Sequence, residues 1–190
     1  KNISKNSSEK FFFGENYKYE KNTKGFTYRD NIGKINLPMP NLQGDFQIGN
    51  VSAAISTVRN LSQFKINKTH IVKAITKIKS EGRLQVIKQG KLTKYISRKN
   101  KILIDGAHNT LAALAINDYL KNFYKNRKIV MILGMMANKE HKKFIQTFKK
   151  KIHSIITLNI PNQDNFIDKE QLTKIAKSCD IPSKTENSIE

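Results

Sequence analysis

Apolar positions along the chain change their spacing twice, and each spacing predicts a different kind of structure. Residues 10–37 alternate aromatic and polar positions between glycines, which is typical of short strands joined by turns. Over residues 51–64, and again over residues 69–78, apolar side chains recur every three or four positions, which predicts two helices with one buried face. Ser80-Glu81-Gly82-Arg83 then fits a helix end, so we place a domain boundary there.

The remainder of the chain alternates strand and helix patterns. Apolar runs without polar alternation predict strands that are buried on both faces, as in a parallel sheet, at residues 102–104, 129–133 and 154–158. Helical patterns lie between and after these runs, at about residues 109–123, 139–150 and 168–177. This order predicts repeated βαβ units with right-handed crossovers, and hence an α/β fold with a mainly parallel sheet of three or four strands.

Net charge could suggest another class of protein. The 35 Lys and Arg residues exceed the 15 Asp and Glu residues and give a formal charge of +20, as in many nucleic-acid-binding proteins. Almost all of these basic residues are lysines, whereas phosphate and base recognition draws heavily on the arginine fork. Lys, Asn and Ile share adenine- and thymine-rich codons, so a biased genome also explains the charge. We expect no nucleic-acid partner, and a basic nucleic-acid-binding module stays the alternative from another class.

Membrane and secretion signals are not apparent. The apolar runs are far shorter than the roughly 20 residues that cross a bilayer. Residues 1–8 contain neither Met nor the apolar core of a signal peptide, which indicates an internal cut. Cys179 is the single cysteine and cannot form an internal disulfide, and no metal-ligand spacing surrounds His141 or His153. We expect a cytoplasmic protein with no membrane partner and no metal site within this chain.

One polar loop stands out as a candidate site. The apolar run 102–104 leads directly into Asp105-Gly106-Ala107-His108-Asn109, which opens the next helical pattern. Ligands of open α/β sheets bind beyond the carboxyl ends of the strands, where this loop is expected. Asp105 can accept two hydrogen bonds from a ribose diol, His108 can donate or stack, and Asn109 can cap the helix. Spacing alone is equally compatible with Asp105 and Asn109 serving only as turn and cap residues.

This loop resembles the signature of the C-terminal domain of folylpolyglutamate and dihydrofolate synthases, in the Mur ligase superfamily, although Thr110 stands where the family usually has proline. Residues 37–50 are similar to the family's Leu-Pro-x-Pro and Gly-x-x-Gln-x-x-Asn stretch. The segment 81–84, Glu-Gly-Arg-Leu, resembles its Pro-Gly-Arg-Leu linker, with Glu81 in place of proline. Residues 134–140 resemble a strand-end glycine followed by Asp-Lys-Asp, with Asn and Glu as substitutions.

The resemblance implies roles for particular residues. Residues that would bind the ATP cofactor are Asn50, at the adenine, together with Arg83, Asp105 and His108. Arg83, which would reach the nucleotide phosphates when the domains close, and His108 are the candidate catalytic residues. Lys139 and Asn109 are candidate contacts to the substrate. Without the resemblance, Asn50 is interpreted as a helix cap and Arg83 as a solvated surface arginine.

The resemblance also implies a fold and a reaction. Residues 1–80 would end a central ATP-binding domain, and residues 81–190 would form a truncated, Rossmann-like C-terminal domain. The enzyme would be a monomeric, ATP-dependent ligase that adds L-glutamate to dihydropteroate or a (tetrahydro)folate through an acyl phosphate. No Gly-x-x-x-x-Gly-Lys-Ser loop occurs in the chain, so this loop, the Mg²⁺ ligands and the pterin pocket are expected in a missing N-terminal part. We therefore expect the chain alone to be inactive. Another Mur-type amino-acid ligase is the alternative within the same class.

Overall fold

The computed structural model describes residues 9–189, which form two compact units that divide between Leu103 and Ile104. Residues 1–8, where the sequence indicated an internal cut, and Glu190 lie outside the described residues. The sequence predicted a domain boundary after residue 80. The assignment of residues 1–80 and 81–190 to two Mur-type domains stays a prediction.

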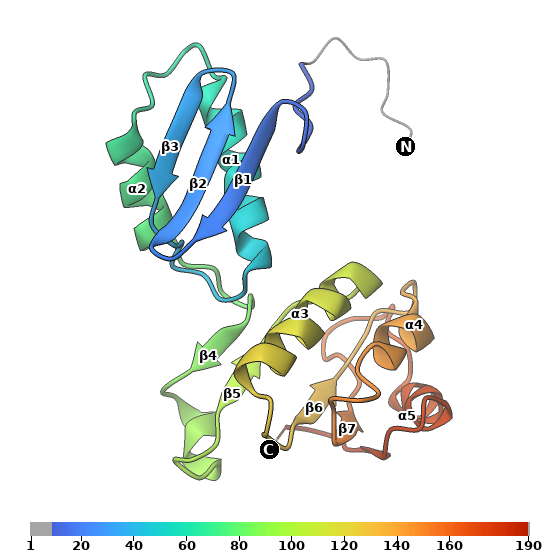
Figure 1. Cartoon of the computed structure of the whole chain (residues 1–190). Coiled ribbons are helices and arrows are strands. Elements are labelled where there is room, and N and C mark those ends of the chain that lie inside the picture. Colours follow the sequence, from blue (N-terminus) through green and yellow to red (C-terminus); the bar gives the residue numbers. More distant parts are fainter. Residues whose placement is uncertain (1–8, 190) are drawn as a thin grey trace. The chain divides into compact units, whose positions relative to one another are not determined.

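The first unit is built on a three-stranded antiparallel sheet, drawn in blue in Figure 1. Its strands β1 (Tyr17–Asn22), β2 (Gly25–Asp30) and β3 (Gly33–Leu37) follow one another through tight turns. The alternation of aromatic and polar positions places one side chain of each pair toward the core and the next toward solvent. The expected strand- and turn-rich structure of residues 10–37 is therefore confirmed.

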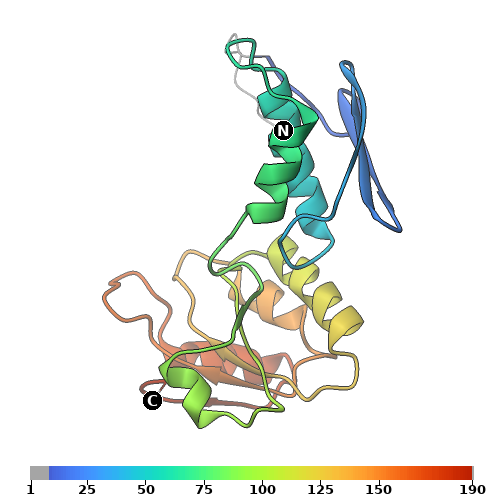
Figure 2. The same cartoon turned by 90° about the vertical axis from the view of Figure 1, so that its left-hand side faces the viewer.

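Two helices, α1 (Phe46–Arg59) and α2 (Lys68–Lys77), lie on one side of this sheet, as Figure 2 shows. Together with the sheet they bury a core of Tyr17, Phe26, Tyr28, Leu37, Ile48, Val51, Ile55, Ile71 and Ile75. Both helices were predicted, but α1 begins at Phe46 rather than at Val51 and ends before Phe64, which is exposed. The apolar spacing of residues 60–64 therefore predicted helix where the structure has none.

A buried ion pair ties the end of α1 to the end of β2. Arg59 Nε lies 2.8 Å from Asp30 Oδ2, and Arg59 Nη2 lies 3.0 Å from Asp30 Oδ1. The side chain of Asp30 is 1% exposed and that of Arg59 is 10% exposed. The Tyr28 hydroxyl and the amides of Ile32 and Gly33 also donate to this carboxylate. A buried carboxylate with this many donors is stable in its ionised form.

We expect this carboxylate to make folding depend on pH. Burial by itself raises the pKa of Asp30, but hydrogen bonds from Arg59 and its charge outweigh burial and hold the pKa below its ordinary value. A lowered pKa stabilises the fold above the unfolded value of about 3.9, and this contribution is lost as the pH falls through the folded value.

Thermal unfolding of the wild type and of Asp30→Asn, at about pH 5 and about pH 3, tests this dependence. The variant cannot titrate at this position. The wild type should therefore lose more stability than the variant on acidification, by on the order of 1 kcal/mol. Equal losses in the two proteins would contradict this account of Asp30.

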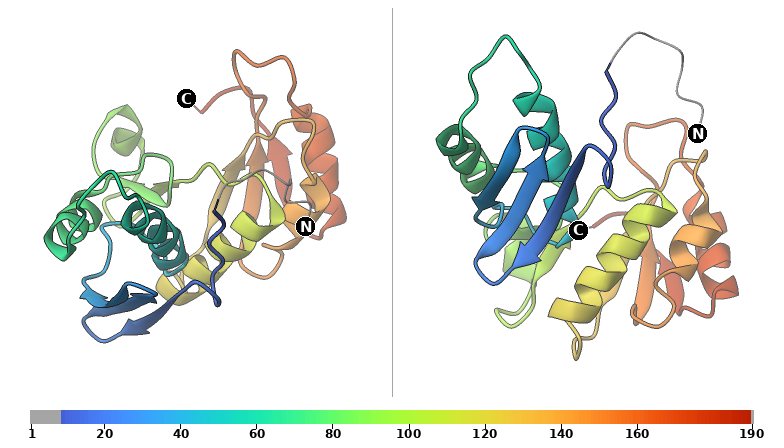
Figure 3. Two further views of the ribbon diagram at one scale, coloured as in Figure 1. Left: turned by 90° about the horizontal axis from the view of Figure 1, so that it is seen from above. Right: turned by 45° about the horizontal axis from the view of Figure 1, so that its top comes forward.

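The second unit contains a parallel sheet with the strand order β6 (Val130–Leu133), β7 (Ser154–Thr157) and β8 (Ser183–Thr185). Its strands are drawn in orange and red in Figure 3. The parallel α/β sheet predicted from the sequence is thus confirmed. β8 was not predicted, because Ser183-Lys184-Thr185 contains no apolar run.

Three helices accompany this sheet: α3 (Thr110–Phe123), α4 (His141–Gln146) and α5 (Lys169–Ser178). α5 packs on β7 and β8, α4 packs on α5, and α3 packs on α4. All three were predicted, but α4 is shorter than its predicted range because the segment after Thr147 forms turns. In residues 9–189 no helix has the length and hydropathy of a membrane span.

Two expectations about the sheet were wrong. The run 102–104 forms β5 (Ile102–Ile104), which pairs with β4 (Gln85–Ile87) in a two-stranded sheet and not with β6. A 3₁₀ helix, η1 (Lys91–Tyr95), lies between these strands. The strand β6 is also not buried on both faces, because Val130 is 50% and Ile132 is 53% exposed. An apolar run predicts a strand, but it does not show which other strand pairs with it or which residues cover its two faces.

Candidate functional site

The loop that follows β5 is held by its own side chains. Asp105 Oδ1 accepts a hydrogen bond from the Ala107 amide at 2.7 Å. His108 Nδ1 lies 3.0 Å from the Gly106 carbonyl oxygen, and the imidazole is exposed. Asn109 Oδ1 accepts from the Ala112 amide at 2.9 Å, so Asn109 is the N-cap of α3. The predicted turn and cap roles of Asp105 and Asn109 are therefore confirmed.

The loop presents polar groups that a ligand could contact. Asp105 contributes a carboxylate, a group that offers about four acceptor positions in all. The amino group of Asn109 keeps its donors, because the cap uses only the side-chain oxygen. The amide groups at the start of α3 favour negative charge nearby. The loop thus combines an acceptor, an exposed imidazole and a helix N-terminus, a combination suited to a nucleotide or another phosphorylated ligand.

The two upstream candidates, Asn50 and Arg83, lie in the first unit. Asn50 is an exposed residue inside α1, and its Nδ2 donates to Oε1 of the buried Gln47 at 2.9 Å. The N-cap of α1 is Asp45, so the alternative interpretation of Asn50 as a helix cap was wrong. Arg83 is exposed on the segment that joins α2 to β4. The binding and catalytic roles of both residues stay predictions.

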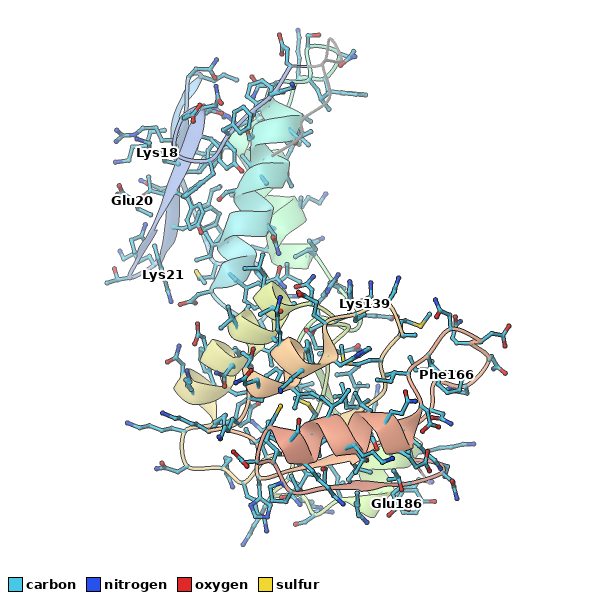
Figure 4. The ribbon with its side chains drawn as sticks, turned by 90° about the vertical axis from the view of Figure 1, so that its right-hand side faces the viewer. Lys18, Glu20, Lys21, Lys139, Phe166 and Glu186 are labelled. Carbon is cyan, nitrogen blue, oxygen red and sulfur yellow. The ribbon has the colours of Figure 1, made fainter. Side chains whose placement is uncertain are left out.

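Lys139 lies on the loop between β6 and α4, at the carboxyl end of a parallel strand. Figure 4 labels it there, with Phe166 on the loop that follows β7. A β-bridge between Met136 and Phe166 joins the two loops, and the Ala137 amide donates to the Asn165 carbonyl at 3.0 Å. Lys139 therefore lies on a loop that is hydrogen-bonded to its neighbour, at the edge where open α/β sheets bind ligands.

Sequence reasoning missed one contributor to this loop. No role was predicted for His141, but it is half-buried and its Nε2 lies 2.9 Å from the Met136 carbonyl oxygen. The bond closes the turn that contains Lys139. A histidine that bonds to a backbone carbonyl leaves no periodic pattern in the sequence, so no signal was available to identify it.

Gly134 allows the loop of Lys139 to pass close to the segment after β7. A β-carbon at this position would lie 3.0 Å from Ile160 Cγ1 and 3.1 Å from the Leu158 carbonyl oxygen. We expect Gly134→Ala to destabilise the protein by about 1–2 kcal/mol, because the backbone carbonyl cannot easily move away. Urea unfolding would measure the change, with Asn138→Ala as a control at an exposed position of the same loop. Equal stability of Gly134→Ala and the wild type would contradict the close approach.

Metal ligands are not gathered in the described part of the chain. Within residues 9–189 no three His, Cys, Asp or Glu side chains lie close enough together to hold a metal ion. The candidate site residues here are suited to contacts with nucleotide and substrate atoms.

Comparison with known proteins identifies the family. Residues 82–189 match the Mur ligase glutamate ligase domain. The chain is 26% identical over 133 residues to the dihydrofolate synthetase of Saccharomyces cerevisiae, covering 68% of this chain and 31% of the relative. It is 28% identical over 130 residues to the dihydrofolate synthase/folylpolyglutamate synthase of Buchnera aphidicola, covering 68% of this chain and 28% of the relative. The matched region thus spans about a third of each relative.

Solved structures show the same fold. E. coli FolC in complex with DHPP and ADP matches with a TM-score of 0.73 and 21% identity, over 93% of this chain and 38% of that chain. The bifunctional folylpolyglutamate synthase/dihydrofolate synthase of Yersinia pestis, complexed with AMPPNP and a Mn ion, matches with a TM-score of 0.73 and 15% identity, over 93% and 38% of the two chains. The resemblance to the folylpolyglutamate and dihydrofolate synthases is confirmed, and the chain belongs to the Mur ligase family through its glutamate ligase domain.

Proposed function

We propose that the protein is an ATP-dependent ligase that joins the amino group of L-glutamate to a carboxylate of dihydropteroate or a (tetrahydro)folate. The observation that carries the proposal is the match of residues 82–189 to the glutamate ligase domain, because this range contains Arg83, Asp105, His108 and Lys139. The FolC structure with ADP and the Yersinia pestis structure with AMPPNP and Mn support ATP and a divalent metal as cofactors.

The proposed reaction activates a carboxylate before the amide forms. A carboxylate oxygen of the pterin substrate attacks the γ-phosphorus of ATP, the bond to the β-phosphate oxygen breaks, and ADP leaves. The glutamate amine then attacks the carbonyl carbon of the acyl phosphate. Phosphate departs, and the amine loses its proton as the amide forms. Because the acyl phosphate is already activated, the protein has to position the reactants and neutralise charge rather than supply a nucleophile.

Each candidate residue has a role that its chemistry fits. Asn50 offers a donor and an acceptor to the adenine edge, and Asp105 can accept from the ribose hydroxyls. The guanidinium of Arg83 would neutralise phosphate charge as it moves from ATP to the carboxylate, and the imidazole of His108 could donate a hydrogen bond to a phosphate oxygen. The ammonium of Lys139 and the amide of Asn109 fit the carboxylates of glutamate. These assignments are part of the proposal.

The full active site would need more than this chain. The chain contains no glycine-rich phosphate loop, and we propose that the rest of the protein supplies this loop and the Mg²⁺ ligands. Residues 1–80 would end the central domain, and residues 81–190 would belong to the C-terminal domain. We expect the 190-residue chain to show no ligase activity by itself, and we expect the full-length protein to be a cytoplasmic monomer.

ADP release by the full-length protein tests the function. Release should require ATP, L-glutamate and either dihydropteroate or tetrahydrofolate, and the active acceptor would show which synthase the protein is. A panel of other amino acids and acceptors would reveal another Mur-type ligase. ADP release that does not depend on glutamate would contradict the proposal.

The acyl phosphate has its own test. If the carboxylate of the acceptor is labelled with ¹⁸O, one labelled oxygen should appear in the released phosphate, because that oxygen bridges carbon and phosphorus in the intermediate. Unlabelled phosphate accompanied by amide product would exclude an acyl phosphate.

A further inference from the structure

The backbone around Arg83 has an unusual conformation. Gly82 has φ of 65°, and Leu84, on the other side of Arg83, has φ of 46°. Glycine adopts positive φ readily, but a leucine there brings its β-carbon close to the following carbonyl and is rare. Such a conformation persists only where the surrounding structure enforces it.

Burial of the Leu84 side chain supplies that constraint. Leu84 is 0% exposed, whereas its neighbour Arg83 is exposed. A β-carbon on Gly44 would lie 3.1 Å from Leu84 Cδ1 and 2.5 Å from Phe46 Cε1, so the absence of a side chain at Gly44 makes room for the leucine. The Gly82 amide donates to Gln85 Oε1 at 2.9 Å and closes the turn around Arg83.

The contact with Gly44 joins the Arg83 segment to the start of α1. The Gly44 carbonyl accepts the amide of Gln47 at 3.0 Å in the first turn of that helix. Gln47 is buried, and its side chain accepts from Asn50 Nδ2 at 2.9 Å. Leu84, Gly44 and Gln47 therefore connect the backbone at Arg83 to the side chain of Asn50 within one compact unit.

We propose that Leu84 is a positioning residue that anchors the Arg83 segment to the start of α1. The inference rests on the proposed function, in which Asn50 contacts adenine. The anchor formed by Leu84 would hold Arg83 at a fixed distance from Asn50. It also assigns linker stiffness to a residue of this chain, since Glu81 stands where the resembling linker has proline. Closure of the site would then bring the C-terminal domain toward a nucleotide and an arginine that already have a fixed arrangement.

A double-mutant cycle in the full-length protein tests whether Leu84 acts through Arg83. Leu84→Ala should lower kcat of glutamate-dependent ADP release roughly tenfold with little change in KM for ATP, because a displaced guanidinium stabilises the transition state poorly. Leu84→Met, which refills the volume, should restore most of the turnover. Arg83→Ala/Leu84→Ala should be no slower than Arg83→Ala alone, because the anchor then has nothing to position.

Ile71→Ala serves as the matched control. It also removes a buried aliphatic side chain from the first unit, but one that belongs to α2 and to the core cluster of the three-stranded sheet, which does not include Leu84. Its kcat should stay within about twofold of wild type at a temperature where both variants are folded. Multiplicative losses in the double variant, or a loss in Ile71→Ala equal to that in Leu84→Ala, would overturn the proposal.

Trypsin provides a readout that needs no activity. The bond after Arg83 should be protected in the native full-length protein, because the next residue is buried, and Leu84→Ala should be cut there at least roughly tenfold faster than Ile71→Ala. Equal cleavage rates would overturn the anchor even if the ligase activity is confirmed. A wild-type protein without glutamate-dependent ADP release would instead overturn the proposed function, and the cleavage rates would still decide on the anchor.

Discussion

Arg83→Ala in the full-length protein is expected to lower kcat of ligation roughly 100-fold, with a much smaller change in KM for ATP. Arg83 is exposed and lies on the short segment between α2 and β4. We propose that its fork contacts the phosphate that is losing its bond to ADP. An arginine that binds charge developing in the transition state contributes to turnover more than to ground-state binding.

Steady-state kinetics with saturating glutamate and acceptor would measure the effect. Arg127→Ala, at an exposed arginine of the second unit, is the matched control and should retain wild-type kinetics. Arg83→Lys should be intermediate, because lysine keeps the charge and loses the bidentate fork. Unchanged kcat in Arg83→Ala would remove this residue from the site and return it to a solvated surface arginine.

Asp105→Ala is expected to raise KM for ATP on the order of 10- to 100-fold, because hydrogen bonds from the ribose to a charged acceptor would be lost. Part of this effect could come from the loop, since Asp105 also accepts the Ala107 amide. Asp105→Asn separates the two contributions, because its side-chain oxygen can still accept that amide while the charge is gone.

The expected result for Asp105→Asn is a melting temperature close to wild type together with a raised KM for ATP. Asp118→Ala, at an exposed acid of α3 that pairs with Lys121, is the control and should leave KM unchanged. A wild-type KM in both Asp105 variants would mean that this side chain only shapes the turn.

Elements set by local chemistry were predicted well. Asn109 caps α3 because its side chain satisfies a free amide of the first turn, and the cap and the apolar period together indicated this helix. The strands β6 and β7 were recognisable because parallel strands contain continuous apolar runs. These signals depend on a few neighbouring residues, so they are visible in the sequence.

Elements that depend on distant partners were predicted poorly. β5 contains the same kind of apolar run as β6, yet it pairs with β4 across the intervening 3₁₀ helix. Hydrophobicity does not distinguish these two partners. The site shows the same limit. The Asp-Gly-Ala-His-Asn motif located Asp105 and His108, but it did not indicate that His141 contacts the loop of Lys139 or that Leu84 is buried beside Arg83. Leu84 packs against Gly44, which is distant in the sequence, and His141 bonds to a nearby backbone carbonyl; no spacing rule describes either contact.

Direct detection of the amide product tests the central claim. The full-length protein would be incubated with ATP, Mg²⁺, ¹³C-labelled L-glutamate and dihydropteroate or tetrahydrofolate, and the pterin products would be analysed by mass spectrometry. The account predicts a product that is heavier by one labelled glutamyl residue and forms in equal amount to ADP. ADP formed without any glutamylated pterin, by folded protein that binds ATP, would contradict it.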